Sequence, residues 1–162
     1  MTFRMFTLGC SVVLVLFAVS AGVAQDRKPA KKEVDAIRAC AVKYADDVSD
    51  GERRCLFNLV ATPCTKRPEA KSTAGTADCY RREQAVWDEL LNENFQRLNG
   101  DLDEQQKTKA REMQRAWIAY RDTTCAFYYD KIQGSMATSM TAACLARETA
   151  RRALLLAFFA TL

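Results

Sequence analysis

The sequence predicts a small, exported, all-α domain stapled by disulfides. Apolar residues recur at helical spacing over most of the chain, and no stretch alternates polar and apolar residues as a strand does. Six cysteines remain once an N-terminal signal is removed. These observations predict one helical bundle, with three body helices and a short N-terminal helical hairpin, of a size that can bury its own core.

The first 24 residues have the pattern of a secretory signal peptide. One positive charge, Arg4, precedes an apolar run from about Leu8 to Val19, and Gly22 and Ala24 occupy the two positions where signal peptidase needs small side chains. The apolar run is short for a bilayer span of about 20 residues, although a retained anchor stays open as the alternative. We expect a periplasmic or secreted protein whose membrane contact is limited to the cleaved signal.

An N-terminal extension is expected between the signal and the body. It begins with the short basic segment DRKPAKK, read as a solvated linker. Two short helices are expected at residues 33–47 and 51–61. Residues 62–78 are rich in Pro, Thr, Ser and Gly and are predicted to form a loop. We assign residues 25–63 to this extension and residues 64–162 to the helical body.

The first long helix of the body is predicted to follow Cys79. Asp78 is placed to cap its start, and Asn99-Gly100 is placed to end it in a left-handed conformation. One face keeps the i, i+3, i+4, i+7 spacing of an amphipathic helix. This face consists of Glu83, Val86, Trp87, Leu90, Leu91, Asn94, Phe95 and Leu98.

Two further long helices complete the body. The second is expected from about Asp103 to Ile132, with a polar first half and an aromatic second half. Gly134-Ser135 breaks it. The third is expected from about Ala137 to Phe159 and again has apolar residues at helical spacing.

The six remaining cysteines predict a disulfide framework. The chain has no histidine, and the CxxC and HxxxH spacings of zinc sites are absent, so a metal site is disfavoured. In a helical hairpin, residues equidistant from the turn lie at the same height, which selects a sequential pairing. Each bridge then closes a loop and lowers the conformational entropy of the unfolded chain, which stabilises the fold by about 3 kcal/mol. The expected pairs are Cys40–Cys55, Cys64–Cys79 and Cys125–Cys144.

Several motifs resemble one known family. The segments CYRREQAVWDELLN and QRAWIAYRDTTC, then a Gly-Ser turn, then CLARETARRALLL are similar to the LprI-like lysozyme inhibitor family of exported bacterial proteins. The resemblance covers about residues 64–156 and implies an all-helical, disulfide-bonded protein that inhibits lysozyme in the bacterial envelope. Residues 33–63 extend beyond these motifs.

The segment QRAWIAYRDTTC raises the question of chemistry, binding or packing. We interpret Trp117 and Tyr120 as core residues, because aromatics at helical spacing bury readily and supply much of a small core's area. Arg121 and Asp122 are adjacent and do not face each other on a helix. Asp88 is therefore the expected partner of Arg121, in a partly buried ion pair that fixes helix register. A functional role for these charges stays open.

Catalysis and nucleic-acid binding are not supported. Ser135 and Thr149 have no histidine to activate them, and acids such as Asp88 and Glu89 lie on an ordinary polar helix face. The mature chain has 23 basic side chains, the 24 of the whole sequence less Arg4, against 20 acidic ones, and the two signs are interspersed. We therefore expect no enzyme, no cofactor, no metal and no nucleic-acid partner.

Two classes of function remain. The resemblance implies an inhibitor that binds and occludes a lysozyme, and the alternative is an envelope structural or stress protein that shares the fold without that target. A lysozyme cleft is locally acidic because its catalytic pair is two carboxylates, which suits a projecting basic loop. Residues 131–139 are favoured over residues 65–75, since a disulfide clamps their helices. Lys131 and Ser135 are the expected contacts.

Overall fold

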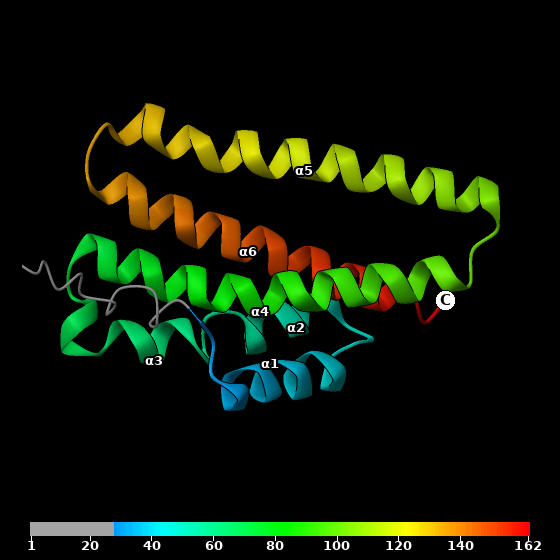
Figure 1. Ribbon diagram of the computed structural model, residues 1–162, viewed down its shortest axis with the longest axis horizontal. Coiled ribbons are helices and arrows are strands. Elements are labelled where there is room, and N and C mark those ends of the chain that lie inside the picture. Colours follow the sequence, from blue (N-terminus) through cyan, green and yellow to red (C-terminus); the bar gives the residue numbers. More distant parts are fainter. Residues whose placement is uncertain (1–27) are drawn as a thin grey trace, which may run out of the picture.

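The computed structural model describes residues 28–162, which form helices joined by short turns (Figure 1). Among these residues no strand occurs, so the all-α prediction is confirmed. The predicted signal peptide and its cleavage site lie outside the described residues. The helices are α1 (Lys31–Lys43), α2 (Val48–Cys55), α3 (Ala61–Thr65), the 3-10 helix η2 (Pro68–Ala70), α4 (Thr73–Gly100), α5 (Glu104–Ile132) and α6 (Met136–Phe159).

No helix in the described part of the chain has both the length and the apolar character needed to cross a membrane.

Helix α4 starts earlier than the sequence predicted. Its cap is Ser72, whose hydroxyl accepts a hydrogen bond from the Gly75 amide at 3.0 Å, while Asp78 lies inside the helix and pairs with Arg81. A Cβ at position 75 would lie 2.7 Å from the Glu69 carbonyl oxygen. Only glycine therefore lets η2 pack this closely on the first turn of α4. The predicted loop is correspondingly shorter.

The predicted bounds of α5 and α6 agree closely with the structure, whereas the short helices expected at residues 33–47 and 51–61 are α1 at Lys31–Lys43 and α2 at Val48–Cys55, and α3 begins at Ala61. Helix α4 ends at Gly100, yet no described glycine has a positive φ, so the left-handed stop was wrong. Asp103 caps α5 in a reciprocal box with Gln106. The break between α5 and α6 lies where predicted, but the left-handed residue is Gln133, with φ of 51°, and not Gly134.

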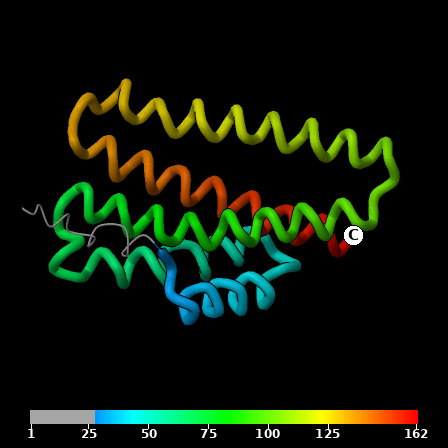
Figure 2. The backbone as a smooth tube through the Cα atoms, viewed as in Figure 1, coloured from blue at the N-terminus to red at the C-terminus, as the bar shows by residue number. Residues whose placement is uncertain are grey.

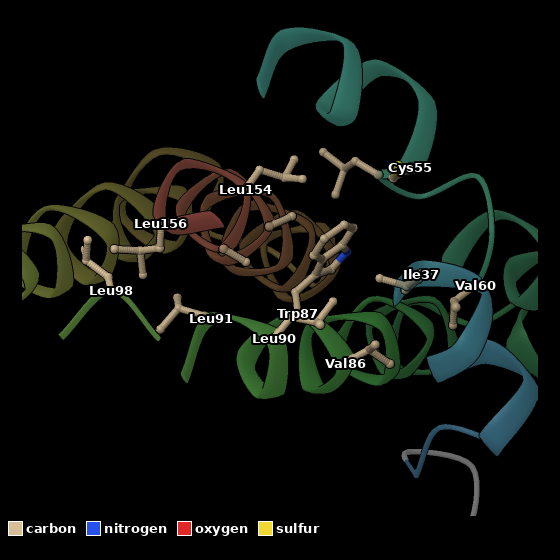
Figure 3. Packing of buried hydrophobic residues seen from close by; sticks show 13 residues of the cluster. Ile37, Cys55, Val60, Val86, Trp87, Leu90, Leu91, Leu98, Leu154 and Leu156 are labelled. Atoms are coloured by element: carbon tan, nitrogen blue, oxygen red, sulfur yellow. The ribbon is translucent and has the colours of Figure 1, made fainter. Parts of the chain in front are cut away.

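The core lies mainly between α4 and α6, which form the most extensive helix contact of the described chain. Trp87 is fully buried there, facing Leu154 of α6 (Figure 3). The N-terminal segments add Ile37 of α1 and Val60, which precedes α3, to the same cluster. The predicted apolar face of α4 is confirmed, and the N-terminal segments share one core with the body.

A buried carboxylate ties the N-terminal segments to α4. Glu83 is fully buried and accepts hydrogen bonds from the amides of Phe57 at 2.7 Å and Ala61 at 2.8 Å, and from Trp87 Nε1 at 3.1 Å. Burial raises the pKa of the Glu83 carboxyl, although the three hydrogen bonds act in the opposite direction. Glu83 thereby holds the α2–α3 connection, where Phe57 has a φ of 64°.

The three disulfides join the pairs that the hairpin argument expected. Each links two elements: α1 to α2, α3 to α4, and α5 to α6. Ion pairs add a further tie between α1 and α4, where Arg38 binds Glu93 and Glu89, and Arg82 binds Glu33 at 2.7 Å. The disulfides are Cys40–Cys55, Cys64–Cys79 and Cys125–Cys144.

Glu83→Gln is expected to destabilise the fold. A glutamine oxygen can still accept from Phe57 and Trp87, but its amide group would face the Ala61 N–H and leave that donor unpaired. The free energy of unfolding should fall by about 1–3 kcal/mol, measured by urea denaturation. Asp88→Asn on the exposed side of the same helix is the control and should change stability by less than about 0.5 kcal/mol. Equal losses would contradict this role of Glu83.

Candidate functional site

Helix α5 lies at the outer edge of the molecule, with α6 between it and the N-terminal helices (Figures 1 and 2). It packs mainly on α6. The buried core cluster takes its residues from α4, α6 and the N-terminal segments and none from α5. Along all of α5, Ala110 and Cys125 alone are buried. The helix that contains QRAWIAYRDTTC is therefore largely a surface element.

A stripe of buried and half-buried side chains, both polar and apolar, joins α5 to α6. Arg152 Nε of α6 donates a hydrogen bond to Gln114 Oε1 at 2.8 Å. The guanidinium groups of Arg152 and Arg121 lie 5.6 and 4.8 Å from the centre of the Trp117 ring, within the range of cation–π attraction. Cys125 completes the stripe through its disulfide to α6. Polar contacts and the disulfide thus add to the packing between the two helices.

The structure corrects the prediction that Trp117 and Tyr120 are core residues. Trp117 is half-buried and contacts the edge of the core, and Tyr120 is 54% exposed. Two faces of α5 can both be buried only when the helix lies between two neighbours. Because α5 packs mainly on α6, one stripe of the helix is covered and the flanks stay in contact with water.

The expected ion pair between Arg121 and Asp88 is also wrong. Arg121 pairs with its neighbour Asp122 at 2.7 Å while stacking on Trp117. Its long side chain curls back along the helix surface, which the backbone spacing alone does not reveal. Asp88 is exposed on α4, and Asn92 one turn further on is its nearest polar contact. Helix α5 makes its main contact with α6 and not with α4.

Arg152 is a buried cation without a carboxylate partner. It is 6% exposed, forms no ion pair among the described residues, and its Nη2 has no hydrogen-bond acceptor. Burial lowers the pKa of its guanidinium. Its compensation comes from Gln114 and from the face of Trp117. The sequence did not single out Arg152, since its neighbours on α6 gave no sign that it points inward.

Exposed apolar side chains gather on the α5–α6 hairpin. Of the seven large ones exposed among the described residues, five lie on α5 or at the first residue of α6. They are Ile118, Tyr120, Phe127, Tyr129 and Met136. Isolated exposed apolar residues need no explanation, but a concentration of aromatics on one element is typical of an interaction surface.

An apolar groove of about 650 Å³ lies at the opposite end of α5. Leu98 and Leu102, Ala110 and Met113 of α5, and Phe159 of α6 form its apolar lining. The groove therefore lies near the connection between α4 and α5, beside the end of α6.

The expected contacts, Lys131 and Ser135, lie at the tip of the hairpin. Both side chains are exposed, and Lys131 makes no ion pair among the described residues. The Cys125–Cys144 disulfide lies just behind the tip, and the Thr141 hydroxyl donates to the Cys125 carbonyl oxygen at 3.3 Å. The tip is thus rigid and accessible.

Two buried polar side chains of the described chain, on α4 and α6, have structural roles. Thr149 is buried and donates its hydroxyl proton to the Leu145 carbonyl oxygen at 2.7 Å, so its role is structural. Glu83 is enclosed by three donors and faces no open groove. No group of three or more potential metal ligands forms among the described residues.

The two tryptophans are expected to contribute unequally to stability. Trp87→Ala should lower the free energy of unfolding by about 3–5 kcal/mol, because a fully buried ring is lost. Trp117→Ala should cost roughly half as much, since part of this ring already contacts water. Denaturant titration of both variants checks this, and equal losses would return Trp117 to the core.

Arg152→Met should leave the free energy of unfolding unchanged or raise it by about 1 kcal/mol. The substitution keeps the apolar stem and removes a buried charge that has no counterion. Gln114 is partly exposed and can bond to water instead. Thermal unfolding of the variant measures the effect, and a loss of more than about 2 kcal/mol would show that the stacking on Trp117 outweighs the burial of charge.

Comparison with known proteins identifies a family. The sequence matches the family described as lysozyme inhibitor LprI over residues 64–156. Comparison with curated proteins and with solved structures finds no match. The matched range begins in α3, includes α4 and α5 with most of α6, and contains two of the three disulfides described above. It covers more than half of the chain, and the protein therefore belongs to the LprI family of lysozyme inhibitors.

Proposed function

We propose that this protein is an exported inhibitor of lysozyme that binds the enzyme and occludes its substrate cleft. Membership of the LprI family is the observation that carries the proposal. Three disulfides among the described residues suit a protein that works outside the cytoplasm. A rigid helical body that lacks an evident catalytic group suits a steric inhibitor.

The tip of the α5–α6 hairpin is the contact that we propose for the entry of the cleft. Lys131 offers an unpaired positive charge to a cleft that holds two catalytic carboxyl groups. Ser135 lies beside it in the turn and supplies a hydroxyl group for hydrogen bonding. The disulfide behind the tip limits the entropy that the turn would lose on binding.

Lys131→Glu combined with Ser135→Glu should raise the inhibition constant at least tenfold, or by roughly 1.4 kcal/mol. Two negative charges would then face the carboxylates of the cleft. Mature protein and variant are compared in cell-wall lysis assays against lysozymes of several types, with pull-down on the immobilised enzymes. Circular dichroism checks that the fold is unchanged.

Lys71→Glu combined with Ala74→Glu is the matched control. It makes the same change in net charge at exposed positions of the 65–75 segment. Inhibition that responds to this control and not to the tip variant would move the contact to residues 65–75. A mature protein that neither binds nor inhibits any lysozyme would refute the proposed function and favour an envelope structural or stress protein.

A further inference from the structure

One flank of α5 presents a continuous surface that the fold leaves uncovered. Its residues recur at intervals of three or four, which places them on one side of the helix. Tyr120 and Phe127 are 54% and 60% exposed. Met113, at the end of this surface that is farther from the hairpin tip, is partly buried. We call this surface the Tyr120 face, and it consists of Met113, Ala116, Tyr120, Thr124, Phe127 and Lys131.

The Tyr120 face runs from the hairpin tip to the apolar groove. Lys131 lies at the tip end, and Met113 is shared with the groove. Helix α5 rises by about 1.5 Å per residue, so the distance from Met113 to Lys131 is roughly 27 Å. This is long enough to follow an extended substrate cleft, and the groove provides a hollow in which a partner side chain can be buried.

The charge of the hairpin favours an acidic partner. Residues 104–159 hold nine basic and five acidic side chains, a net charge of +4, whereas residues 28–103 hold 13 basic and 14 acidic ones, a net charge of −1. The basic half of the molecule is thus the half that exposes α5. Complementary charge would steer and orient a partner with a negative groove.

Ion pairs within the hairpin neutralise most of its acidic side chains and leave its net charge of +4 on the remaining cations. Four of its five acids already have a basic partner, in the pairs Glu104–Lys107, Glu112–Lys109, Asp122–Arg121 and Glu148–Arg151. Asp130 is the acid without an ion pair among the described residues. Among the described residues, the exposed cations of α5 without an ion pair are Arg111, Arg115 and Lys131. By helical spacing Lys131 lies on the Tyr120 face, whereas Arg111 and Arg115 share the opposite flank with Ile118.

The opposite flank of α5 is less suited to docking. It also exposes two apolar side chains, Ile118 and Tyr129, at 40% and 48%. Asp122, bound to Arg121, interrupts them, and neither residue lines the groove. This flank therefore provides a matched control on the same helix.

We propose that the Tyr120 face and the adjoining groove are the surface on which a lysozyme docks through its acidic substrate cleft. Helix α5 would lie along the cleft, with Tyr120 and Phe127 as the buried anchors and Lys131 toward the carboxyl pair. Aromatic residues are the commonest hot spots of protein interfaces, because they bury a large area at a low cost in conformational entropy. The proposal rests on the proposed function and extends the contact from the tip to the whole helix.

The test compares two double variants of the full mature chain. Tyr120→Ser with Phe127→Ser removes the anchors of the Tyr120 face, and Ile118→Ser with Tyr129→Ser removes a similar pair from the opposite flank. All four side chains are exposed, so both variants should keep their circular dichroism spectrum and melting temperature. The first should raise the inhibition constant by about thirtyfold or more, as expected for hot-spot anchors, and the second by less than about threefold.

Each other outcome overturns the assignment. Inhibition that survives loss of Tyr120 and Phe127, or falls equally in both variants, leaves the proposed function standing and removes the Tyr120 face as its surface. A wild-type chain that inhibits no lysozyme refutes both. Sedimentation of the free protein adds a further check. If the wild-type chain is a dimer, the first variant is a monomer and inhibition is unchanged, a second copy of the chain covers this face.

Discussion

A single buried carboxylate determines how the N-terminal third of the chain is placed. Glu83 binds the amides of Phe57 and Ala61, and these two donors fix the connection between α2 and α3 against α4. Val60 enters the core between them. Two disulfides then close on either side, through Cys55 before this connection and Cys64 after it. Apolar packing is not directional, whereas two hydrogen bonds from the loop to one buried carboxylate require a particular backbone conformation.

This placement decides which sides of the central helices are occupied. The N-terminal helices cover one side of the α4–α6 pair, and α5 lies on the other side against α6 (Figure 1). The core is complete without a buried residue of α5. Helix α5 is consequently attached by a disulfide, by one stripe of polar and apolar side chains, and by its two end connections. The residues that form the core and the surface that we propose for binding therefore lie in different parts of the molecule.

Much of the fold could be predicted from the sequence. The apolar face of α4, the limits of α5 and α6, and the disulfide pairs follow from periodicity and from hairpin geometry. Periodicity shows which residues of a helix share a face, but not whether another helix covers that face. Trp117 and Tyr120 were misplaced for this reason, because the same spacing suits a core position and an exposed one equally well.

The polar residues of the interior show the other limit. Glu83 fits the spacing of the buried face of α4, and an acid in such a stripe is a signal that a partner is needed. Its partners are backbone N–H groups of a loop more than twenty residues away, which no sequence pattern encodes. For the candidate surface, the exposure of Lys131 and Ser135 was predictable from their turn. The exposure of the aromatic residues on α5 was not predictable, because it depends on how few neighbouring helices cover α5.

The small contribution of α5 to the core also affects how this protein can evolve. Surface substitutions away from buried contacts usually change stability by no more than about 0.5 kcal/mol. Most outward positions of α5 therefore lie outside the constraints of folding, provided that Cys125 and the few residues facing α6 are kept. The helix can exchange side chains almost freely while α4, α6 and the N-terminal segments maintain the scaffold. If α5 binds the target as we propose, substitutions on its exposed side can change the specificity of binding without prior substitutions that stabilise the core.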